Sequence, residues 1–363
     1  MGFKCGIVGL PNVGKSTLFN CLTRAAIAAE NYPFCTIEPN VGMVPVPDPR
    51  LDELAAIVKP EKVVPTMMQF VDIAGLVAGA SRGEGLGNKF LAHIRQTDAL
   101  AHIVRCFEDD DVTHVAGRVD PLSDIETIDT ELVLADLETA ERALERAVKQ
   151  TRSGDKEARR LAGLLERVVA HFGAGSPLRT LALEAEERVL LGPWQFITGK
   201  PVLYVANVDD SGVEDNALVD RVRRHAAVEG AEVVVLCAAL EAELSQLAPA
   251  EQEEFLADLG QTEPGLDRLI RAGYGLLDLL TFFTAGPKEV RAWTVRRGAT
   301  APQAAGRIHT DFEHGFIRAE VTAYADYIAC AGEAGAKAAG KLRLEGRDYV
   351  VAEGDVMHFR FNV

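Results

Sequence analysis

The run Gly9-Leu-Pro-Asn-Val-Gly14-Lys15-Ser16-Thr17 fits the phosphate-binding pattern G-x-x-x-x-G-K-[ST]. Its glycines let the backbone wrap around phosphates, and backbone N–H groups at a helix N-terminus supply positive potential. In this pattern Lys15 reaches the β- and γ-phosphates and Ser16 ligates Mg²⁺. We therefore predict a Mg²⁺-dependent nucleotide site, with phosphate contacts from Asn12, Val13, Gly14, Lys15, Ser16 and Thr17.

A second acidic element is Asp72-Ile-Ala-Gly75, which begins 56 residues after Ser16 and follows an apolar, strand-like run. Open α/β sheets bind ligands at this end of their strands. There Asp72 can hold Mg²⁺ through water, while the backbone N–H of Gly75 meets the γ-phosphate. Between the two motifs lies Tyr32-Pro-Phe-Cys-Thr36, in which Thr36 either closes over Mg²⁺ and the γ-phosphate as a switch element or serves as a turn residue.

Five short apolar runs have to position these groups. They span residues 3–8, 66–73, 100–107, 201–207 and 232–238, and they mostly alternate with helical patterns. Continuous apolarity over such lengths favours strands that are buried on both faces. The expected fold class is therefore α/β, with a mostly parallel, doubly wound sheet covered by helices.

A helical insertion is expected between the third and fourth of these strands. Residues 124–188 are rich in Leu, Ala, Glu and Arg, have no proline before Pro177, and place apolar residues three and four apart. The break Thr151-Arg-Ser-Gly-Asp155 divides the segment into two long helices, which predicts an antiparallel hairpin. The alternative is an ordinary pair of packed helices in the main domain.

The patterns change again near residue 280. Short strand-like pieces at residues 289–295, 316–322, 349–351 and 356–361 are separated by glycine turns and predict a small α+β domain. A C-terminal basic cluster lies within it, opposed by the early acid Glu289, and is either a nucleic-acid contact or a solvated face. Its members are Lys288, Arg291, Arg296, Arg297, Arg307 and His309.

The overall composition constrains partners and compartment. Among 363 residues, 54 acidic and 38 basic side chains give a formal charge of −16, so a contact with nucleic acid has to be local, and no specific DNA sequence is expected. No leader pattern and no apolar stretch of ~20 residues occur, which argues against secretion and membrane spanning. The cysteines form no C-x-x-C pair and are expected to be reduced thiols of a cytoplasmic protein. They are Cys5, Cys21, Cys35, Cys106, Cys237 and Cys330.

Longer runs make the sequence resemble a known family. The phosphate-binding loop, Asn31-Tyr-Pro-Phe-Cys-Thr-Ile-Glu-Pro-Asn40 and Asp72-Ile-Ala-Gly-Leu-Val77 are similar to the Obg-related translation-factor GTPases. Ser81-Arg-Gly-Glu-Gly-Leu-Gly87 and residues 284–293 and 301–309 narrow the resemblance to the YchF/Obg-like ATPases, over essentially the whole chain. In that family Gly83, Gly85 and Gly87 belong to a mobile switch loop, not to a dinucleotide fingerprint.

The resemblance implies an architecture and an activity. It places a P-loop NTPase G domain at residues 1–123 and 191–279, a coiled-coil insertion at 124–190 and a β-grasp TGS domain at 280–363. The implied activity is that of a ribosome-associated ATPase, and ribosomal RNA would be contacted through the TGS-like domain.

The base-reading motif N-K-x-D appears as Asn207-Val208-Asp209-Asp210, without the lysine whose stem normally covers guanine. Aliphatic Val208 can pack on either purine. The family usually has glutamate in the fourth position, a change associated with tolerance of adenine, whereas Asp210 can accept from guanine N1–H and N2–H₂. We favour ATP, on the resemblance and the missing lysine, and GTP remains the alternative. Cys237 and Ala238 would supply backbone beside the base.

Leu76 stands where Ras-type enzymes carry the water-orienting glutamine, and it has no hydrogen-bonding group, so slow intrinsic hydrolysis is expected. Asn12 is the residue type that holds K⁺ against the phosphates in K⁺-dependent relatives. His114, in Asp109-Asp-Asp-Val-Thr-His114, either swings in as a catalytic polar group or is a solvated histidine. Arg95 and Arg105 are expected only to form surface ion pairs.

Three classes of function fit these motifs. The first is a molecular switch that hydrolyses a nucleotide and contacts a ribosome or RNA through the C-terminal basic cluster, with the hairpin as a second candidate contact. The second is a small-molecule kinase, which would need a second substrate pocket with an acidic base and a lid arginine. The third is a non-hydrolysing, nucleotide-sensing scaffold, for which Leu76 is an argument. The switch-like segment 32–36 and the β-grasp tail favour the first class.

Overall fold

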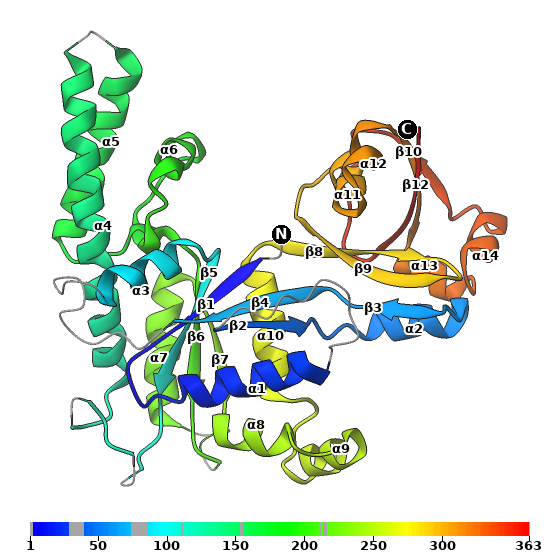
Figure 1. Ribbon diagram of the computed structural model, residues 1–363, viewed down its shortest axis with the longest axis horizontal. Helices are drawn as coiled ribbons and strands as arrows, with labels where there is room; N and C mark the ends of the chain where they lie inside the picture. The colour runs from blue at the N-terminus through cyan, green and yellow to red at the C-terminus, as the bar shows by residue number, and fades with distance from the viewer. Residues whose placement is uncertain are drawn as a thin grey trace. The chain divides into compact units, whose positions relative to one another are not determined.

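Figure 1 shows a computed structural model of the chain, which describes residues 3–28, 40–73, 86–109, 112–115, 117–152, 155–210, 212 and 216–362. The chain divides into two compact units. The first comprises Met1–Ala25, Ile37–Gly42 and Gln69–Gly273, and the second comprises Ala26–Thr36, Met43–Met68 and Tyr274–Val363. The division after Gly273 lies close to the expected boundary at residue 279. Residues 43–68, which the sequence-based division places in the G domain, fall in the second unit.

One sheet has six strands in the order β2-β4-β1-β5-β6-β7, and all of it belongs to the first unit except residues 43–45 of β2 and 67–68 of β4. β1 pairs in parallel with β4 and β5, β5 with β6, and β6 with β7. Every residue of β5 and β6 is buried, because helices cover both faces of these strands. The mostly parallel α/β sheet predicted from the apolar runs is confirmed. The strands are β1 Lys4–Val8, β2 Val41–Pro45, β4 Met67–Asp72, β5 Ala99–Arg105, β6 Val202–Asn207 and β7 Glu232–Leu236.

β2 was not predicted, and its burial pattern explains why. Only two of its five residues are buried, so it lacks the continuous apolar character of the inner strands. The helices that surround the sheet or follow it are α1 Lys15–Ala28, α3 Leu86–Arg95, α7 Ala217–Glu229, α8 Ala238–Leu244, α9 Pro249–Asp258 and α10 Gly265–Leu276.

The helical insertion is a hairpin of α4 Pro121–Thr151 and α5 Lys156–Gly173, which lie side by side in Figure 1. Its core is rich in alanine, with Ala143 and Ala147 of α4 buried together with Ala162 and Leu165 of α5, because small side chains let the two helices approach closely. The second helix is shorter than predicted. Glycines at 173 and 175 and Pro177 end it, and η2 Leu178–Thr180, α6 Ala185–Leu191, η3 Gly192–Trp194 and η4 Ile197–Gly199 follow.

Asp136 fastens α4 to the strand that follows the insertion. Its carboxylate is 1% exposed and accepts hydrogen bonds from the backbone N–H groups of Ile197 and Thr198, at 3.0 and 2.7 Å. The hydroxyl of Thr198 donates a third bond at 2.7 Å. A buried carboxylate that holds three donors fixes η4, and with it the start of β6, against the helix.

The second unit contains a mixed six-stranded sheet with the order β11-β10-β12-β8-β9-β3. The pairs β8–β9, β10–β12 and β10–β11 are antiparallel, whereas β12–β8 and β3–β9 are parallel. One buried cluster includes residues of α11 and another includes residues of α2. The elements are α2 Pro49–Val58, β3 Lys62–Val64, β8 Leu279–Ala285, β9 Glu289–Arg296, α11 Ala301–Ile308, α12 Thr310–His314, β10 Phe316–Ala323, α13 Tyr324–Ala329, α14 Glu333–Ala338, β11 Arg343–Glu345 and β12 Asp355–Phe361.

The predicted strand at residues 349–351 does not form. Val350 makes only an isolated bridge with Thr300, and the segment is held instead by Asp355, whose carboxylate accepts from the Tyr349 hydroxyl and the Ala352 N–H. Within the part of the chain that the structure describes, no helix combines the length and apolar character needed to cross a bilayer.

Candidate functional site

The phosphate-binding loop connects β1 to α1, which is the order that its motif requires. Gly9 has a φ of +154°, and a Cβ there would lie 2.6 Å from the carbonyl oxygen of Ile103. Gly14 has a φ of +95°, and a Cβ would collide with the side-chain amide of Asn207. Both positions are therefore restricted to glycine by backbone conformation and by space. Between them, Asn12 adopts a left-handed conformation with a φ of +61°.

Lys15 lies in the first turn of α1 and is only 7% exposed. Its Nζ donates a 2.6 Å hydrogen bond to the carbonyl oxygen of Leu10, within the same loop. Burial lowers the pKa of Lys15 to about 8, against the opposing effect of the nearby Asp72 carboxylate. A buried ammonium with one backbone partner is poised to take up phosphate oxygens, which satisfy its charge better than a carbonyl does.

The residues expected to hold Mg²⁺ fit that role by chemistry. Asp72 is the last residue of β4, and burial raises the pKa of its carboxyl, with Lys15 opposing the shift. A nearby divalent cation would stabilise the ionised form of this half-buried carboxylate. Ser16 and Thr17 are exposed at the start of α1, so the Ser16 hydroxyl is accessible to a cation. The Asp72 carboxylate and the Ser16 hydroxyl both offer oxygen atoms, the ligands that Mg²⁺ prefers.

Asn207 joins three parts of the expected site. Its side-chain Nδ2 donates to the carbonyl oxygen of Val13 at 2.9 Å, and its Oδ1 accepts from the backbone N–H of Ala238, also at 2.9 Å. Asn207 is 4% exposed and ends β6. One amide thus holds the phosphate-binding loop against the segment that opens α8, and it brings together residues that the sequence places far apart.

The other residues of the expected base site differ in exposure. Asp210 is exposed in the turn after β6, where its carboxylate is accessible to a ligand. Val208 is only 2% exposed and lies in the core, whereas a side chain that packs on a base has to present a free face. Cys237 precedes α8 and is 5% exposed, and burial raises the pKa of its thiol.

His114 is buried and paired. Its Nε2 lies 3.0 Å from Oδ2 of Asp124, which belongs to the first turn of α4, and the two side chains are 5% and 4% exposed. The neighbouring carbonyl of Thr113 accepts a 3.1 Å hydrogen bond from Nδ2 of Asn12. The phosphate-binding loop is therefore connected, through residues 113 and 114, to the base of the helical insertion. The sequence analysis missed Asp124, because no local motif marks a partner ten residues away.

Arg105 is not a surface residue, contrary to the expectation from the sequence. It is 1% exposed at the end of β5, and its guanidinium donates to the carbonyl oxygens of Phe107, Asp109 and Val112, at 3.1, 3.2 and 2.8 Å. A guanidinium has five N–H donors and can hold several carbonyls at once. Arg105 therefore shapes the segment that leads to His114.

Several expected site residues lie outside the described residues. Thr36, Gly75 and Leu76 are among them, as are Gly83 and Gly85 of the glycine-rich run. Their roles remain predictions from the sequence.

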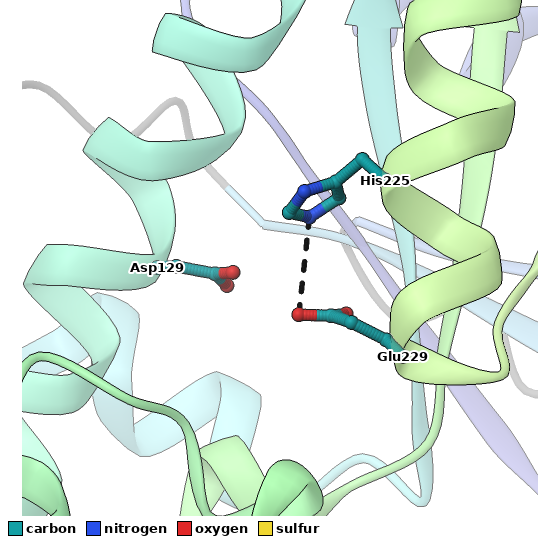
Figure 2. Close-up of side chains that lie close together, drawn as sticks. All are labelled: Asp129, His225 and Glu229. Carbon is teal, nitrogen blue, oxygen red and sulfur yellow. Dashed lines mark ion pairs between the residues drawn. The ribbon is translucent and has the colours of Figure 1, made fainter.

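A second polar cluster lies where α4 meets α7. Figure 2 shows Asp129 of α4 and His225 and Glu229 of α7 pointing toward one another. One ring nitrogen and one oxygen of each carboxylate lie within 4.8 Å of one another. Arg179 of η2 already supplies a positive charge here: Nη2 is 2.7 Å from Oδ2 of Asp129, and Nε is 3.0 Å from Oε2 of Glu229. The Tyr204 hydroxyl also donates to Glu229, at 2.9 Å. The cluster is thus a partly buried network of ion pairs and hydrogen bonds that joins the hairpin to the sheet.

The C-terminal basic cluster is partly paired. Arg291 lies over the Trp293 ring, 4.0 Å from its centroid, with Nη1 3.8 Å from Oε1 of Glu289. Arg297 forms a 3.0 Å ion pair with Asp278. Lys288, Arg296, Arg307 and His309 are exposed. The Arg291–Glu289 pair is half-buried, the Arg297–Asp278 pair is exposed, and His309 lies 3.3 Å from Asp311 in another exposed contact. Exposed ion pairs are weak, so the charges of Arg297 and His309 stay available to a partner.

Known proteins resemble this chain over its full length. Residues 4–147 match a family described as 50S ribosome-binding GTPase, and residues 279–362 match a YchF GTPase C-terminal family described as a protein of unknown function. Ribosome-binding ATPase YchF is 64% identical in Haemophilus influenzae and 60% identical in Escherichia coli O157:H7, in both cases over 100% of each chain. The Bacillus subtilis protein of that name is 55% identical, also over 100% of each chain.

Solved structures agree with the fold. The structure of the Schizosaccharomyces pombe YchF GTPase matches with a TM-score of 0.90 and 36% identity, and the match covers 99% of this chain and 98% of that one. A GTP-binding protein from Pyrococcus horikoshii OT3 matches with a TM-score of 0.63 at 22% identity, over 99% of this chain and 100% of that one, and shares the fold.

Proposed function

This chain belongs to the YchF family, and from that premise we propose that it is a ribosome-binding, Mg²⁺-dependent nucleotide hydrolase that prefers ATP and acts as a molecular switch. The observation that carries the proposal is a pair of hydrogen bonds made by the side-chain amide of Asn207. The amide donates to the carbonyl of Val13 in the phosphate-binding loop and accepts from the N–H of Ala238, which is expected beside the base. Lys15, buried in that loop, supplies the positive charge for the β- and γ-phosphates.

The preference for ATP is supported by the names of the curated relatives and by the absence of a lysine after Asn207. Asp210 is the residue that keeps GTP as the alternative, because its exposed carboxylate can accept from guanine N1–H and N2–H₂. Direct competition between labelled ATP and GTP for the purified protein decides between the two.

We assign Mg²⁺ to Ser16 and Asp72, with Thr36 completing the site from the switch segment. The cation would neutralise charge on the β- and γ-phosphate oxygens. Gly75 would contact the γ-phosphate through its N–H. Asn12 is the proposed K⁺ ligand through Oδ1, the oxygen of its amide, while Nδ2 of the same amide donates to the carbonyl of Thr113 and fixes its orientation.

His114 is the proposed group that orients the attacking water in place of the glutamine that Leu76 replaces. In the described structure its Nε2 is held by Asp124, and it is too buried to meet a water on the γ-phosphate. Its catalytic role therefore requires it to leave Asp124 during turnover. The variant His114→Ala, which has no side-chain hydrogen-bonding group, should lose most of the hydrolysis rate and keep its affinity for nucleotide.

The central test removes the phosphate contacts. Lys15→Ala and Ser16→Ala should abolish measurable hydrolysis while far-UV circular dichroism stays unchanged, because both side chains serve the ligand. Lys337→Ala, which removes an exposed lysine from the second unit, is the matched control and should behave like the wild type. If Lys15→Ala hydrolyses ATP and GTP at the wild-type rate, the assignment of the site fails.

Ribosomal RNA is the proposed partner of the TGS-like domain, through the C-terminal basic cluster. The names of the relatives support a ribosomal partner, and the local charge supports contact with phosphate in an acidic protein. A cytoplasmic location follows from a ribosomal partner, and neither a membrane nor a specific DNA sequence is proposed as a partner.

A further inference from the structure

The closed end of the helical hairpin carries a second concentration of positive charge. We define the hairpin tip as residues 146–152 and 155–159, which are the last turns of α4 with its C-cap and the start of α5 with its N-cap. It holds five basic and two acidic side chains, a formal charge of +3 in a chain of −16. The basic residues are Arg146, Lys149, Arg152, Lys156 and Arg159.

All five basic side chains of the hairpin tip are exposed. Among the described residues, none of them forms an ion pair, whereas three other arginines of the hairpin do. Arg142 pairs with Glu138, Arg160 with Glu186, and Arg167 with Glu187. The positive charges of the tip are therefore available to a partner molecule, whereas Arg142, Arg160 and Arg167 are partly neutralised by carboxylates of the same unit.

The charges are also close together along the hairpin. With a rise of about 1.5 Å per residue, Arg146 lies about 8 Å before the end of α4 and Arg159 about 5 Å after the start of α5. All five side chains therefore project from about the last two turns of α4 and the first turn of α5. That length matches a few phosphates of a nucleic-acid backbone, which are spaced by several ångströms along each strand.

The composition of the hairpin tip favours a nucleic acid over a protein. Protein interfaces have a core enriched in aromatic and apolar side chains. Among the described residues of the hairpin tip, the one large exposed apolar side chain is Val148, at 42%, and the sequence has no aromatic residue there. Long, flexible basic side chains without an apolar centre are typical of contacts to phosphates.

We propose that the hairpin tip is an RNA-binding surface that contacts the phosphate backbone of ribosomal RNA, separately from the C-terminal basic cluster. This inference deepens the proposed ribosomal function and rests on it for the identity of the RNA. Its recognition is electrostatic, so it should be independent of sequence and sensitive to salt.

The test compares two variants of the full-length protein that each lose three positive charges from the hairpin. The tip variant is Lys149→Gln/Arg152→Gln/Lys156→Gln, and the matched control is Arg142→Gln/Arg160→Gln/Arg167→Gln. Binding is measured across a salt series to two probes, purified ribosomes and protein-free ribosomal RNA. For the tip variant we expect weaker binding and a log–log salt slope smaller by about 2–3 units, since each lost phosphate contact removes about 0.7–0.9. The control should keep the wild-type slope to within about one unit.

Three outcomes would overturn the inference. If the wild-type protein does not bind protein-free ribosomal RNA, the tip is not an RNA-binding surface. If the tip variant and the control have equal salt slopes, the RNA contact lies elsewhere. A tip variant that loses ribosomes but keeps protein-free RNA identifies a ribosomal protein as the partner of the tip. If the wild type binds protein-free RNA through the tip but does not bind ribosomes, the RNA-binding surface stands and the ribosomal function fails. Thermal unfolding of both variants confirms that they are folded.

Discussion

Arg179 offers a quantitative test of how the helical insertion is attached to the sheet. The variant Arg179→Met removes the guanidinium from Asp129 and Glu229, whose side chains are 15% and 7% exposed, and keeps a side chain of similar length. Removing one partner of a buried ionic group typically lowers the free energy of unfolding by about 3–5 kcal/mol. The same change at Arg142, whose pair with Glu138 is exposed, should lower it by about 0–1 kcal/mol.

The loss at Arg179 should depend on pH. Burial raises the pKa of the Asp129 carboxyl in the folded protein, Arg179 opposes that effect, and the variant removes the opposition. A carboxyl whose pKa is raised on folding stabilises the folded state below its unfolded pKa of about 3.9, and this contribution is lost as the pH rises through the folded value. The deficit of the variant should therefore grow as the pH rises above about 3.9, from the acidic range in which Asp129 is protonated in both folded proteins toward pH 8. Each pH unit in that window changes it by up to about 1.4 kcal/mol per titrating group.

Tryptophan fluorescence during urea unfolding can measure this deficit. Trp194 packs against the hairpin core and Trp293 lies in the second unit, so a Trp293→Phe background leaves Trp194 as the reporter. Adding Asp129→Asn and Glu229→Gln to Arg179→Met removes every formal charge of the Asp129–Arg179–Glu229 contacts and should restore most of the stability. A loss below about 1 kcal/mol at pH 8, or a loss that does not grow from the acidic limit of folding to pH 8, would refute the reasoning.

Three further predictions concern the ligands. Asp210→Glu should shift preference toward ATP in competition binding, and a wild-type preference for GTP beyond about tenfold, or about 1.4 kcal/mol, would make the protein a GTPase of the same fold. The purified protein should hydrolyse nucleotide slowly, and the rate should be higher in K⁺ than in Na⁺ and higher with ribosomes. Asn12→Ala should remove the effect of K⁺. Equal rates under all conditions would contradict both the K⁺ dependence and the stimulation by ribosomes. Arg291→Ala/Arg296→Ala/Arg297→Ala should weaken binding to ribosomes and flatten its salt dependence by about 2–3 units of slope without changing nucleotide affinity; an unchanged slope would remove the C-terminal basic cluster from the interface.

The sequence predicted the parts of the site that depend on local order. Lys15 and Asn207 could be located because a strand, a loop and a helix follow one another in a fixed pattern, and β5 and β6 because strands buried on both faces are continuously apolar. The end of α5 could have been found from the glycines at 173 and 175. The sequence analysis extended the helical pattern to residue 188, although two glycines and Pro177 favour an end near residue 173.

Contacts between distant residues could not be predicted in this way. Arg179 is 50 residues from both Asp129 and Glu229, and no spacing rule relates them. Arg105 carries a charge, which usually indicates a surface position, but its donors are satisfied by the carbonyls of the chain that follows it. Tertiary structure decides such cases.

α4 gives the hairpin a mechanical property. It is a single helix of 31 residues, about 46 Å long, with Asp124 in its first turn and Arg146 and Lys149 near its last. A tilt of about 5° at the base would move the far end by about 4 Å over that length. The base is also the point at which Asp124 holds His114, next to the carbonyl that binds Asn12. A displacement of the far end would therefore reach the phosphate-binding loop only through the first half of α4, which Asp129 and Asp136 anchor.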